Sequence, residues 1–186
     1  MKVRVPKVYP CRALAIDPGP KTSGVVILDT RHDPPQILRH WQDMSTKVLR
    51  DNLWFPDRFD LFGCPFEAVL LERVASFGMP VGETTINTIL WSGRLMEVCE
   101  RVGIPLYRMT RKKVVHSLCF NIKAGDSNVR RAILDLYPKT GGGKTPQIGT
   151  KNQPGPLYGI ANDAFAALAL GIAWARKHGH IELVHI

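Results

Sequence analysis

Residues 13–28 read ALAIDPGPKTSGVVIL, in which two apolar runs flank a turn rich in proline and glycine. The first run ends at Asp17 and the second begins after Gly24, which predicts a strand, a tight turn and a second strand. Asp17 is therefore expected at a fixed point on a sheet. A carboxylate beside a buried strand loses hydration, so it is usually compensated by a cation or a metal.

Two further acids stand at the ends of apolar segments. Glu72 closes the strand-like run 68–71, and Asp163 precedes the helix-like run 164–170. Carboxylates are the ligands that Mg²⁺ prefers, and two such ions roughly 3.5–4 Å apart can drive hydrolysis of a phosphodiester. Taken singly, Asp17 could cap its turn, Glu72 could pair with Arg73, and Asp163 could be a helix N-terminal acid. Together the three acids predict a metal site.

The charge of the chain is unevenly distributed. The net charge is +9, but residues 1–100 hold 12 basic and 12 acidic residues, whereas residues 101–186 hold 13 basic and 4 acidic residues. This excess predicts a surface that follows nucleic-acid phosphates, with a merely solvated basic face as the alternative. Ten of these 13 basic residues lie between positions 108 and 151, namely Arg108, Arg111, Lys112, Lys113, Lys123, Arg130, Arg131, Lys139, Lys144 and Lys151.

Length and composition predict a single domain spanning residues 1–186. The chain is 45% hydrophobic, and no Ser/Gly linker divides it. The four cysteines form no Cys-x-x-Cys pair, so they are expected to be reduced thiols in a cytoplasmic protein, an organellar location being left open. The apolar stretch 164–175 is too short to cross a bilayer, so no membrane association is expected.

The order of apolar patterns predicts an α/β fold with a mixed sheet. Strands are expected near 11–17, 23–29, 36–42, 66–72 and 104–108. Helices are expected near 45–54, 83–101, 110–119, 127–136 and 162–177.

Residues 138–156 form the low-complexity segment of the chain and contain Gly-Lys-Thr at 143–145. A phosphate-binding loop would need a glycine five residues before Gly143, where Pro138 stands, and a buried strand leading into it. We therefore expect a flexible basic loop near the active site rather than a nucleotide site, with simple mobility as the alternative.

The segments Asp17-Pro18-Gly19, Glu72-Arg73-Val74 and Asn162-Asp163-Ala164, in this order, resemble RuvC-type Holliday-junction resolvases of the ribonuclease H-like superfamily. The resemblance runs from about residue 13 to residue 176 and suggests a phage-encoded member. It implies a five-stranded mixed sheet flanked by helices, a homodimer, and Mg²⁺- or Mn²⁺-dependent nicking of four-way DNA. Asp17, Glu72 and Asp163 would then be the catalytic metal ligands, with two ions in each active site.

The resemblance also indicates which residues are expected to form a dimer interface and to contact DNA. The helix near 83–101 is expected to form part of a two-fold interface through Ile86, Ile89, Leu90, Gly93 and Met96. The residues expected to contact branched DNA are Arg73, Phe77, Arg111, Lys112, Lys113, Lys123, Arg130, Arg131, Lys144 and Lys151.

The chain departs from the family pattern at three positions. The fourth acid or histidine, three residues before the last Asp, is replaced by Ile160, so Asn162 or Glu67 would have to substitute. The aromatic wedge would fall at Ala75, with Phe77 two residues later, and a usually basic position is Asp126. The number of metal ligands and the identity of the wedge residue are thus left open.

Two other classes of protein share parts of these patterns. Actin-like kinases have a similar Asp-x-Gly turn, but they need a second lobe for which 186 residues leave no room. A noncatalytic branched-DNA-binding protein of the same fold is the more serious alternative, because Ile160 is consistent with loss of a ligand. The sequence predicts neither the preferred DNA form, nor a cutting sequence, nor the biological source.

Overall fold

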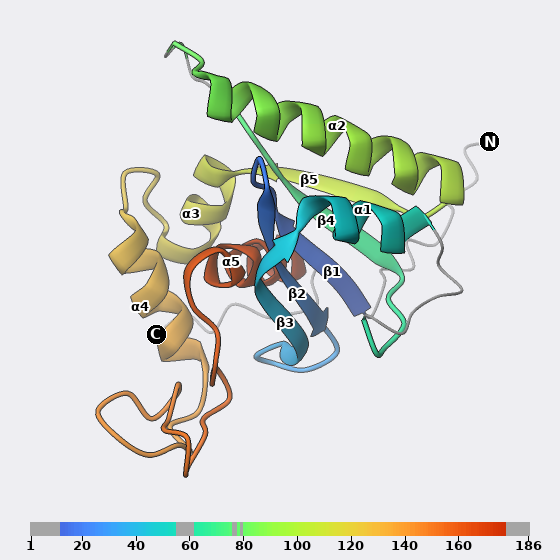
Figure 1. Cartoon of the computed structure of the whole chain (residues 1–186). Helices are drawn as coiled ribbons and strands as arrows, with labels where there is room; N and C mark the ends of the chain where they lie inside the picture. The colour runs from blue at the N-terminus through green and yellow to red at the C-terminus, as the bar shows by residue number, and fades with distance from the viewer. Residues whose placement is uncertain (1–11, 55–61, 76–77, 79, 178–186) are drawn as a thin grey trace, which may run out of the picture.

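The computed structural model describes residues 12–54, 62–75, 78 and 80–177. Within these residues, five strands form one sheet with helices on both faces (Figure 1). The elements are β1 (Arg12–Asp17), β2 (Thr22–Asp29), β3 (Gln36–Ser45), α1 (Thr46–Trp54), β4 (Ala68–Arg73), α2 (Glu83–Val102), β5 (Leu106–Thr110), α3 (Arg111–Cys119), α4 (Asp126–Leu136) and α5 (Asn162–Lys177).

The sheet has the strand order β3-β2-β1-β4-β5. β1 and β2 form an antiparallel hairpin, which β3 extends, whereas β4 runs parallel to β1, and β5 parallel to β4. Parallel neighbours end at the same edge of a sheet, so the last residues of β1, β4 and β5 lie together. The expected five-stranded mixed sheet is confirmed.

Side-chain alternation along β1 divides the core into two layers. Ala13 and Ala15 face α3, α4 and α5, whereas Leu14 and Ile16 face α1 and α2. The small alanines let α5 lie close to the sheet, and a Cβ added at Gly171 of α5 would come within 1.8 Å of Leu28 in β2. The central strands are therefore covered on both faces, and their uninterrupted apolar runs follow from this.

The predicted elements match the observed ones in type and order. The main differences are at two strands, since β3 continues to Ser45 and β5 begins at Leu106 rather than at Ile104. β3 lies at the edge of the sheet and half of its residues remain partly exposed, so apolar periodicity does not mark its end. No helix in the described parts of the chain is long and apolar enough to cross a membrane.

Residues 138–156 fold back on themselves after α4. The Gly141 and Gly142 N–H groups donate to the Pro146 and Gln153 carbonyls at 2.8 and 2.9 Å, and Gly149 forms a bridge with Pro154. Gly149 has φ +79°, and a Cβ there would lie 2.3 Å from the Gly155 nitrogen. Glycine is thus required for a compact loop, while the mobility expected from the sequence stays a prediction.

Gly24 permits a close approach of β2 to the start of α5, and this generates a stability prediction. A Cβ at Gly24 would lie 2.1 Å from the Asp163 carbonyl carbon. Gly24→Ala should therefore lower the free energy of unfolding by about 1–3 kcal/mol, because two backbones must separate. Urea unfolding measures this, with Gly82→Ala as the matched control, since a Cβ at Gly82 would meet no atom beyond its chain neighbours within 4 Å. Equal unfolding free energies for the two variants would contradict the proposed close approach.

Candidate active site

The parallel pairing of β1 and β4 brings two of the predicted acids together. Ile16 is paired with Leu71, so Asp17 and Glu72 are the next residues on adjacent strands. Both acids follow four buried apolar residues, which fixes their backbones in the sheet. The two carboxylates therefore start from neighbouring points at the same edge.

The third acid comes from the start of α5. Gly24 is paired with Asp17, and the missing side chain of Gly24 leaves room for the backbone of Asp163. The preceding Asn162 has φ +43°, a left-handed conformation that asparagine tolerates better than most residues. Asp163 is thus delivered to the same edge as Asp17 and Glu72.

The turn after Asp17 is held by hydroxyl groups. Ser23 Oγ and Thr46 Oγ1 are 2.9 Å apart in the protein interior, and Ser23 Oγ accepts from the Gly19 N–H at 3.4 Å. The Thr46 N–H donates to the Lys21 carbonyl at 3.0 Å. The role of Thr46, the first residue of α1, could not be inferred from the sequence, because its partner Ser23 lies more than 20 residues earlier.

The three acids repel one another electrostatically. Burial is the main cause that raises the pKa of Asp17 to about 7, and the nearby Glu72 and Asp163 carboxylates act in the same direction. Burial also raises the pKa of Glu72, while the Arg111 guanidinium opposes this rise. Like charges that share a partly buried site cannot all ionise without compensation, so the site favours a cation.

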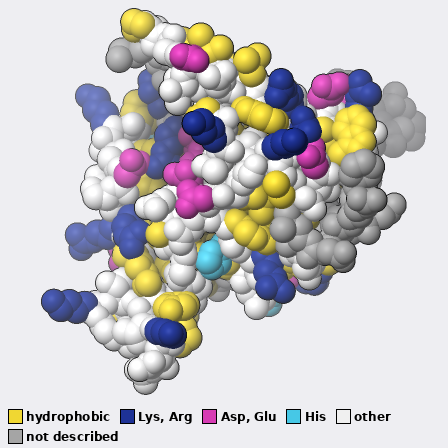
Figure 2. Space-filling view, in the orientation of Figure 1, with side chains coloured by type: hydrophobic (Ala, Val, Ile, Leu, Met, Phe, Trp, Pro, Cys, Tyr) yellow, Lys and Arg dark blue, Asp and Glu magenta, His cyan; other side chains and the backbone are white. Residues whose placement is uncertain are grey.

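An open cavity of about 670 Å³ contains the three acids. In the space-filling view, acidic side chains gather near the centre of this face, with lysine and arginine side chains around them (Figure 2). The lining combines acids, two arginines and an apolar wall, and its residues are Asp17, Glu72, Arg111, Asp126, Val129, Arg130, Asn162, Asp163, Phe165 and Ala166.

The predicted DNA-binding residues fall into separate groups. Arg111 and Arg130 line the acidic cavity, and Arg130 lies over the Phe165 ring at 4.7 Å. Lys112 and Lys113 are exposed on α3 and line a neighbouring groove.

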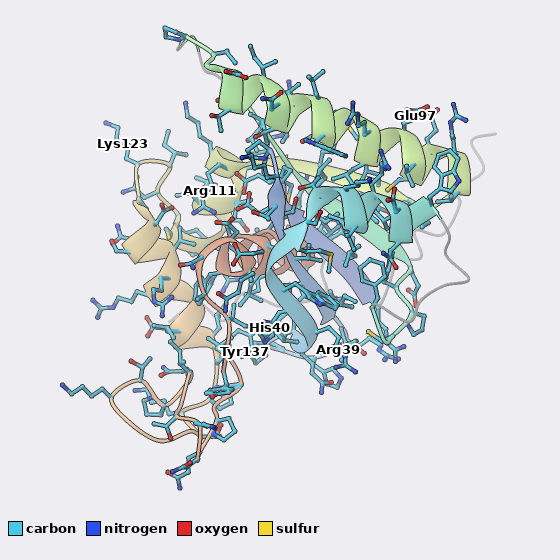
Figure 3. The ribbon with its side chains drawn as sticks, viewed as in Figure 1. Arg39, His40, Glu97, Arg111, Lys123 and Tyr137 are labelled. Atoms are coloured by element: carbon cyan, nitrogen blue, oxygen red, sulfur yellow. The ribbon has the colours of Figure 1, made fainter. Side chains whose placement is uncertain are left out.

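The other expected contacts within the described residues do not line the acidic cavity. Lys123 extends outward from the α3–α4 connection, well away from Arg111 (Figure 3). Arg131 lines a different depression with Asp135. Arg73 is exposed at the end of β4, Lys144 and Lys151 are exposed on the folded loop, and Phe77 lies outside the described residues.

The structure shows which candidates for a fourth ligand lie near the three acids and which do not. Ile160 is buried in the core and offers no ligand. Glu67 precedes β4, where its N–H donates to the Arg12 carbonyl at the start of β1, so it lies at the opposite edge from Glu72. Asn162 lines the acidic cavity, as does Asp126, which the sequence analysis did not consider as a ligand. The available signal in the sequence is that Asp126 is one of only two acids between positions 108 and 151, where ten residues are basic.

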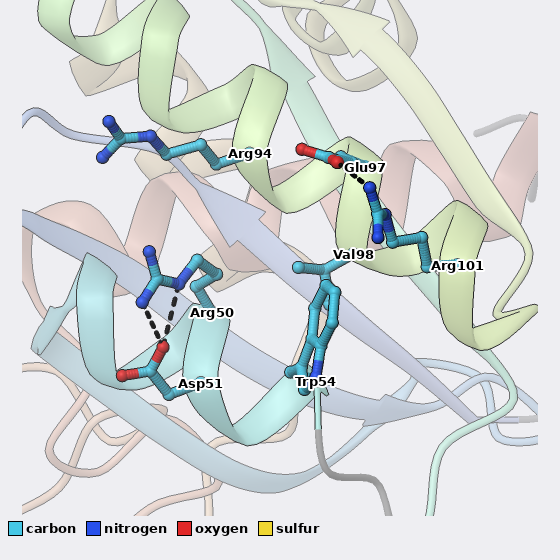
Figure 4. Close-up of a pocket in the computed structure, with 7 residues that line it drawn as sticks. All are labelled: Arg50, Asp51, Trp54, Arg94, Glu97, Val98 and Arg101. Atoms are coloured by element: carbon cyan, nitrogen blue, oxygen red, sulfur yellow. Dashed lines mark hydrogen bonds and ion pairs between the residues drawn. The ribbon is translucent and has the colours of Figure 1, made fainter.

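A second cavity of about 620 Å³ lies between α1 and α2 (Figure 4). Its two acids are paired, Asp51 with Arg50 and Glu97 with Arg101, while Arg94 stacks over the Trp91 ring at 4.5 Å. These charges are compensated locally, so this cavity lacks the clustered acids of the first.

The acidic cavity offers oxygen atoms that suit a metal ion. Glu72 Oε2 is buried without a hydrogen-bond partner, and the acids around it are hard oxygen donors. Over the described residues, no three His, Cys, Asp or Glu side chains are already close enough to hold a metal ion. The donor set fits Mg²⁺, and side-chain movement is needed to bring the carboxylates onto it.

Comparisons with known structures agree with this fold. Thermus thermophilus RuvC in complex with a Holliday junction substrate matches with a TM-score of 0.62 and 16% identity over 90% of this chain and 96% of that chain. The Thermus thermophilus RuvC structure gives 0.60 and 17% over the same shares, and the yeast mitochondrial Holliday junction resolvase Ydc2 gives 0.55 and 14% over 94% and 82%. No protein-family model and no curated protein sequence matches the chain. The chain therefore has the ribonuclease H-like fold of the RuvC-type resolvases.

The raised pKa of Asp17 predicts a pH dependence of stability in metal-free protein. The unfolded Asp17 ionises near pH 3.9 and the folded one near pH 7, so between these values the folded state keeps a proton that the unfolded state has lost. The free energy of unfolding should fall as pH rises through this window, by at most about 1.4 kcal/mol per pH unit. Asp17→Asn should remove much of this slope, as urea unfolding in EDTA at pH 5, 6, 7 and 8 would measure. Parallel pH curves for the two proteins would show that Asp17 titrates normally.

Proposed function

We propose that this chain is a metal-dependent endonuclease that cuts four-way DNA junctions, or related branched DNA, by phosphodiester hydrolysis. The observation that supports the proposal is the meeting of Asp17, Glu72 and Asp163 at one edge of the sheet. The fold supplies the context, since the compared structures include a RuvC solved with a Holliday junction substrate.

Asp17, Glu72 and Asp163 would hold Mg²⁺, or Mn²⁺ in its place, through their carboxylate oxygens. When bound, two such ions supply the positive charge that activates water and offsets charge on the reacting phosphate. The strands and the α5 N-terminus keep the carboxylate backbones in place, because each acid adjoins a buried apolar segment. The backbones of the ligands are therefore fixed before metal binding, and only the carboxylate side chains need to move.

The basic residues would position the DNA around this centre. Arg111 and Arg130, in the cavity itself, are placed to contact phosphates beside the cut. Lys112 and Lys113 extend the positive surface along α3, and such contacts position the duplex without reading its sequence. Binding by this surface should consequently depend strongly on salt concentration.

The central functional prediction concerns cleavage. Asp17→Asn should lower the rate of nicking of a four-way junction by at least about 100-fold, because a metal ligand is lost while the DNA surface is kept. The measurement is a nicking assay with Mg²⁺ on junction, flap, fork and linear DNA, combined with binding titrations. The contrasting variant is Lys112→Ala/Lys113→Ala, which should weaken binding to every DNA form and reduce the salt dependence.

Two results would contradict the proposal. Nicking by Asp17→Asn at the wild-type rate would show that Asp17 is not a catalytic metal ligand. Tight junction binding without nicking by the wild-type protein would support the alternative, a noncatalytic branched-DNA-binding protein.

A homodimer is the second part of the proposal. α2 exposes Ile86, Ile89 and Leu90, whose exposed fractions are 47%, 46% and 58%. A symmetric pair of chains would cover these side chains and present two active sites to a junction with approximate two-fold symmetry.

The dimer is tested by introducing a charge into this apolar face. Wild type should sediment as a dimer at tens of micromolar, roughly the range in which weak dimers form, and Leu90→Glu should sediment as a monomer. Ile122→Glu is the matched control, since Ile122 is 57% exposed but lies outside α2. A monomeric wild type, or a dimer that tolerates Leu90→Glu, would refute this interface.

A further inference from the structure

The guanidinium of Arg111 occupies a position between two acids of the candidate active site. Arg111 is the first residue of α3, and its Nη2 donates a hydrogen bond to Oδ1 of Asp126, the first residue of α4. Its other terminal nitrogen, Nη1, lies 3.9 Å from Glu72 Oε2. One side-chain cation thus lies between an acid at a strand end and an acid at a helix start.

The pairing of Arg111 with Glu72 is incomplete. A separation of 3.9 Å is too long for a hydrogen bond, and both Glu72 Oε2 and Arg111 Nη1 are buried without a hydrogen-bond partner. Buried polar atoms are usually satisfied, so an unsatisfied pair points to a ligand or to a second arrangement of the site. A small divalent ion could satisfy Glu72 more fully than this guanidinium does.

Asp126 offers the carboxylate that position 160 lacks. Ile160 is buried in the core, whereas Asp126 lines the same cavity as Asp17, Glu72 and Asp163. Its side chain is 88% exposed, so it can change rotamer without displacing packed neighbours. A fourth acid on α4 therefore faces the acids of the strand ends from the other side of Arg111.

We propose that Asp126 is the fourth acidic ligand of the metal centre, and that Arg111 neutralises Glu72 and Asp126 until metal ions replace it. The inference rests on the metal centre of the proposed function. A guanidinium and a metal ion beside the same two carboxylates repel each other as like charges, so each weakens the binding of the other. Once released, Arg111 stays at the rim of the cavity, where a DNA phosphate is its natural partner.

The first test compares two arginine variants of the same cavity. Mn²⁺ is titrated calorimetrically into DNA-free protein, where Arg111→Gln should bind Mn²⁺ on the order of 10-fold more tightly than wild type, because its competitor is gone. Arg130→Gln removes the same charge from the same cavity but frees no acid, since Arg130 lies over Phe165. Its effect should be much smaller. Arg111→Lys, which has a shorter reach, should change affinity in the same direction as Arg111→Gln and serves if the latter folds poorly.

The second test isolates the role of Asp126. In the Arg111→Gln background, adding Asp126→Asn should weaken Mn²⁺ binding by about 10-fold or more, an effect that loss of an arginine partner cannot produce there. Asp135→Asn, on the same helix but outside the cavity, is the matched control and should leave the affinity unchanged.

The possible outcomes separate this inference from the proposed function. Equal gains from Arg111→Gln and Arg130→Gln would show that only net charge matters, and an unchanged affinity on adding Asp126→Asn would exclude Asp126 as a ligand. Either result, with Mn²⁺ binding by wild type intact, overturns the inference and leaves the proposed function standing. No Mn²⁺ binding by wild type or by Arg111→Gln overturns both.

Discussion

Carboxylates that share a partly buried site need a cation, and this requirement governs the architecture of the chain. Asp17 and Glu72 start from adjacent parallel strands, and Asp163 reaches the same edge because Gly24 has no side chain. Burial and the neighbouring carboxylates raise the pKa of Asp17 to about 7, because negative charge is unfavourable in this site. The most economical explanation is that these acids are completed by metal ions and by the phosphate that they bind.

The charges outside the acidic cavity complement this arrangement. Figure 2 shows lysine and arginine side chains around the central acids, and the excess of basic over acidic residues lies in the second half of the sequence. DNA would thereby be attracted over a wide surface while metal ions neutralise the point of contact. Arg111 belongs to both the acidic cavity and the basic surface. It faces Glu72 and Asp126 in the DNA-free protein, and it lies beside the expected path of a phosphate.

The sequence predicts most of the fold because apolar periodicity and turn residues act locally. It also predicts the meeting of three acids, since Asp17 and Glu72 end adjacent parallel strands and Asp163 begins a helix that packs against the same sheet. It could not predict the roles of Thr46 and Asp126, whose partners are distant in the chain and become neighbours only through packing. The 138–156 loop shows the same limit, because its glycines indicate a lack of regular structure but not the hydrogen bonds that make it compact.

The need for a cation can be measured without DNA or catalysis. The most direct measurement is the thermal unfolding midpoint of the wild-type protein with and without Mg²⁺, at pH 8 and at pH 5.5. A ligand at 100 times its dissociation constant stabilises the folded state by about 2.7 kcal/mol. A metal site formed by the three acids therefore predicts a clear rise in the unfolding midpoint at pH 8. The rise should be smaller at pH 5.5, where a proton on Asp17 competes with the metal. Identical midpoints with and without Mg²⁺ at both pH values would show that these acids do not bind the ion.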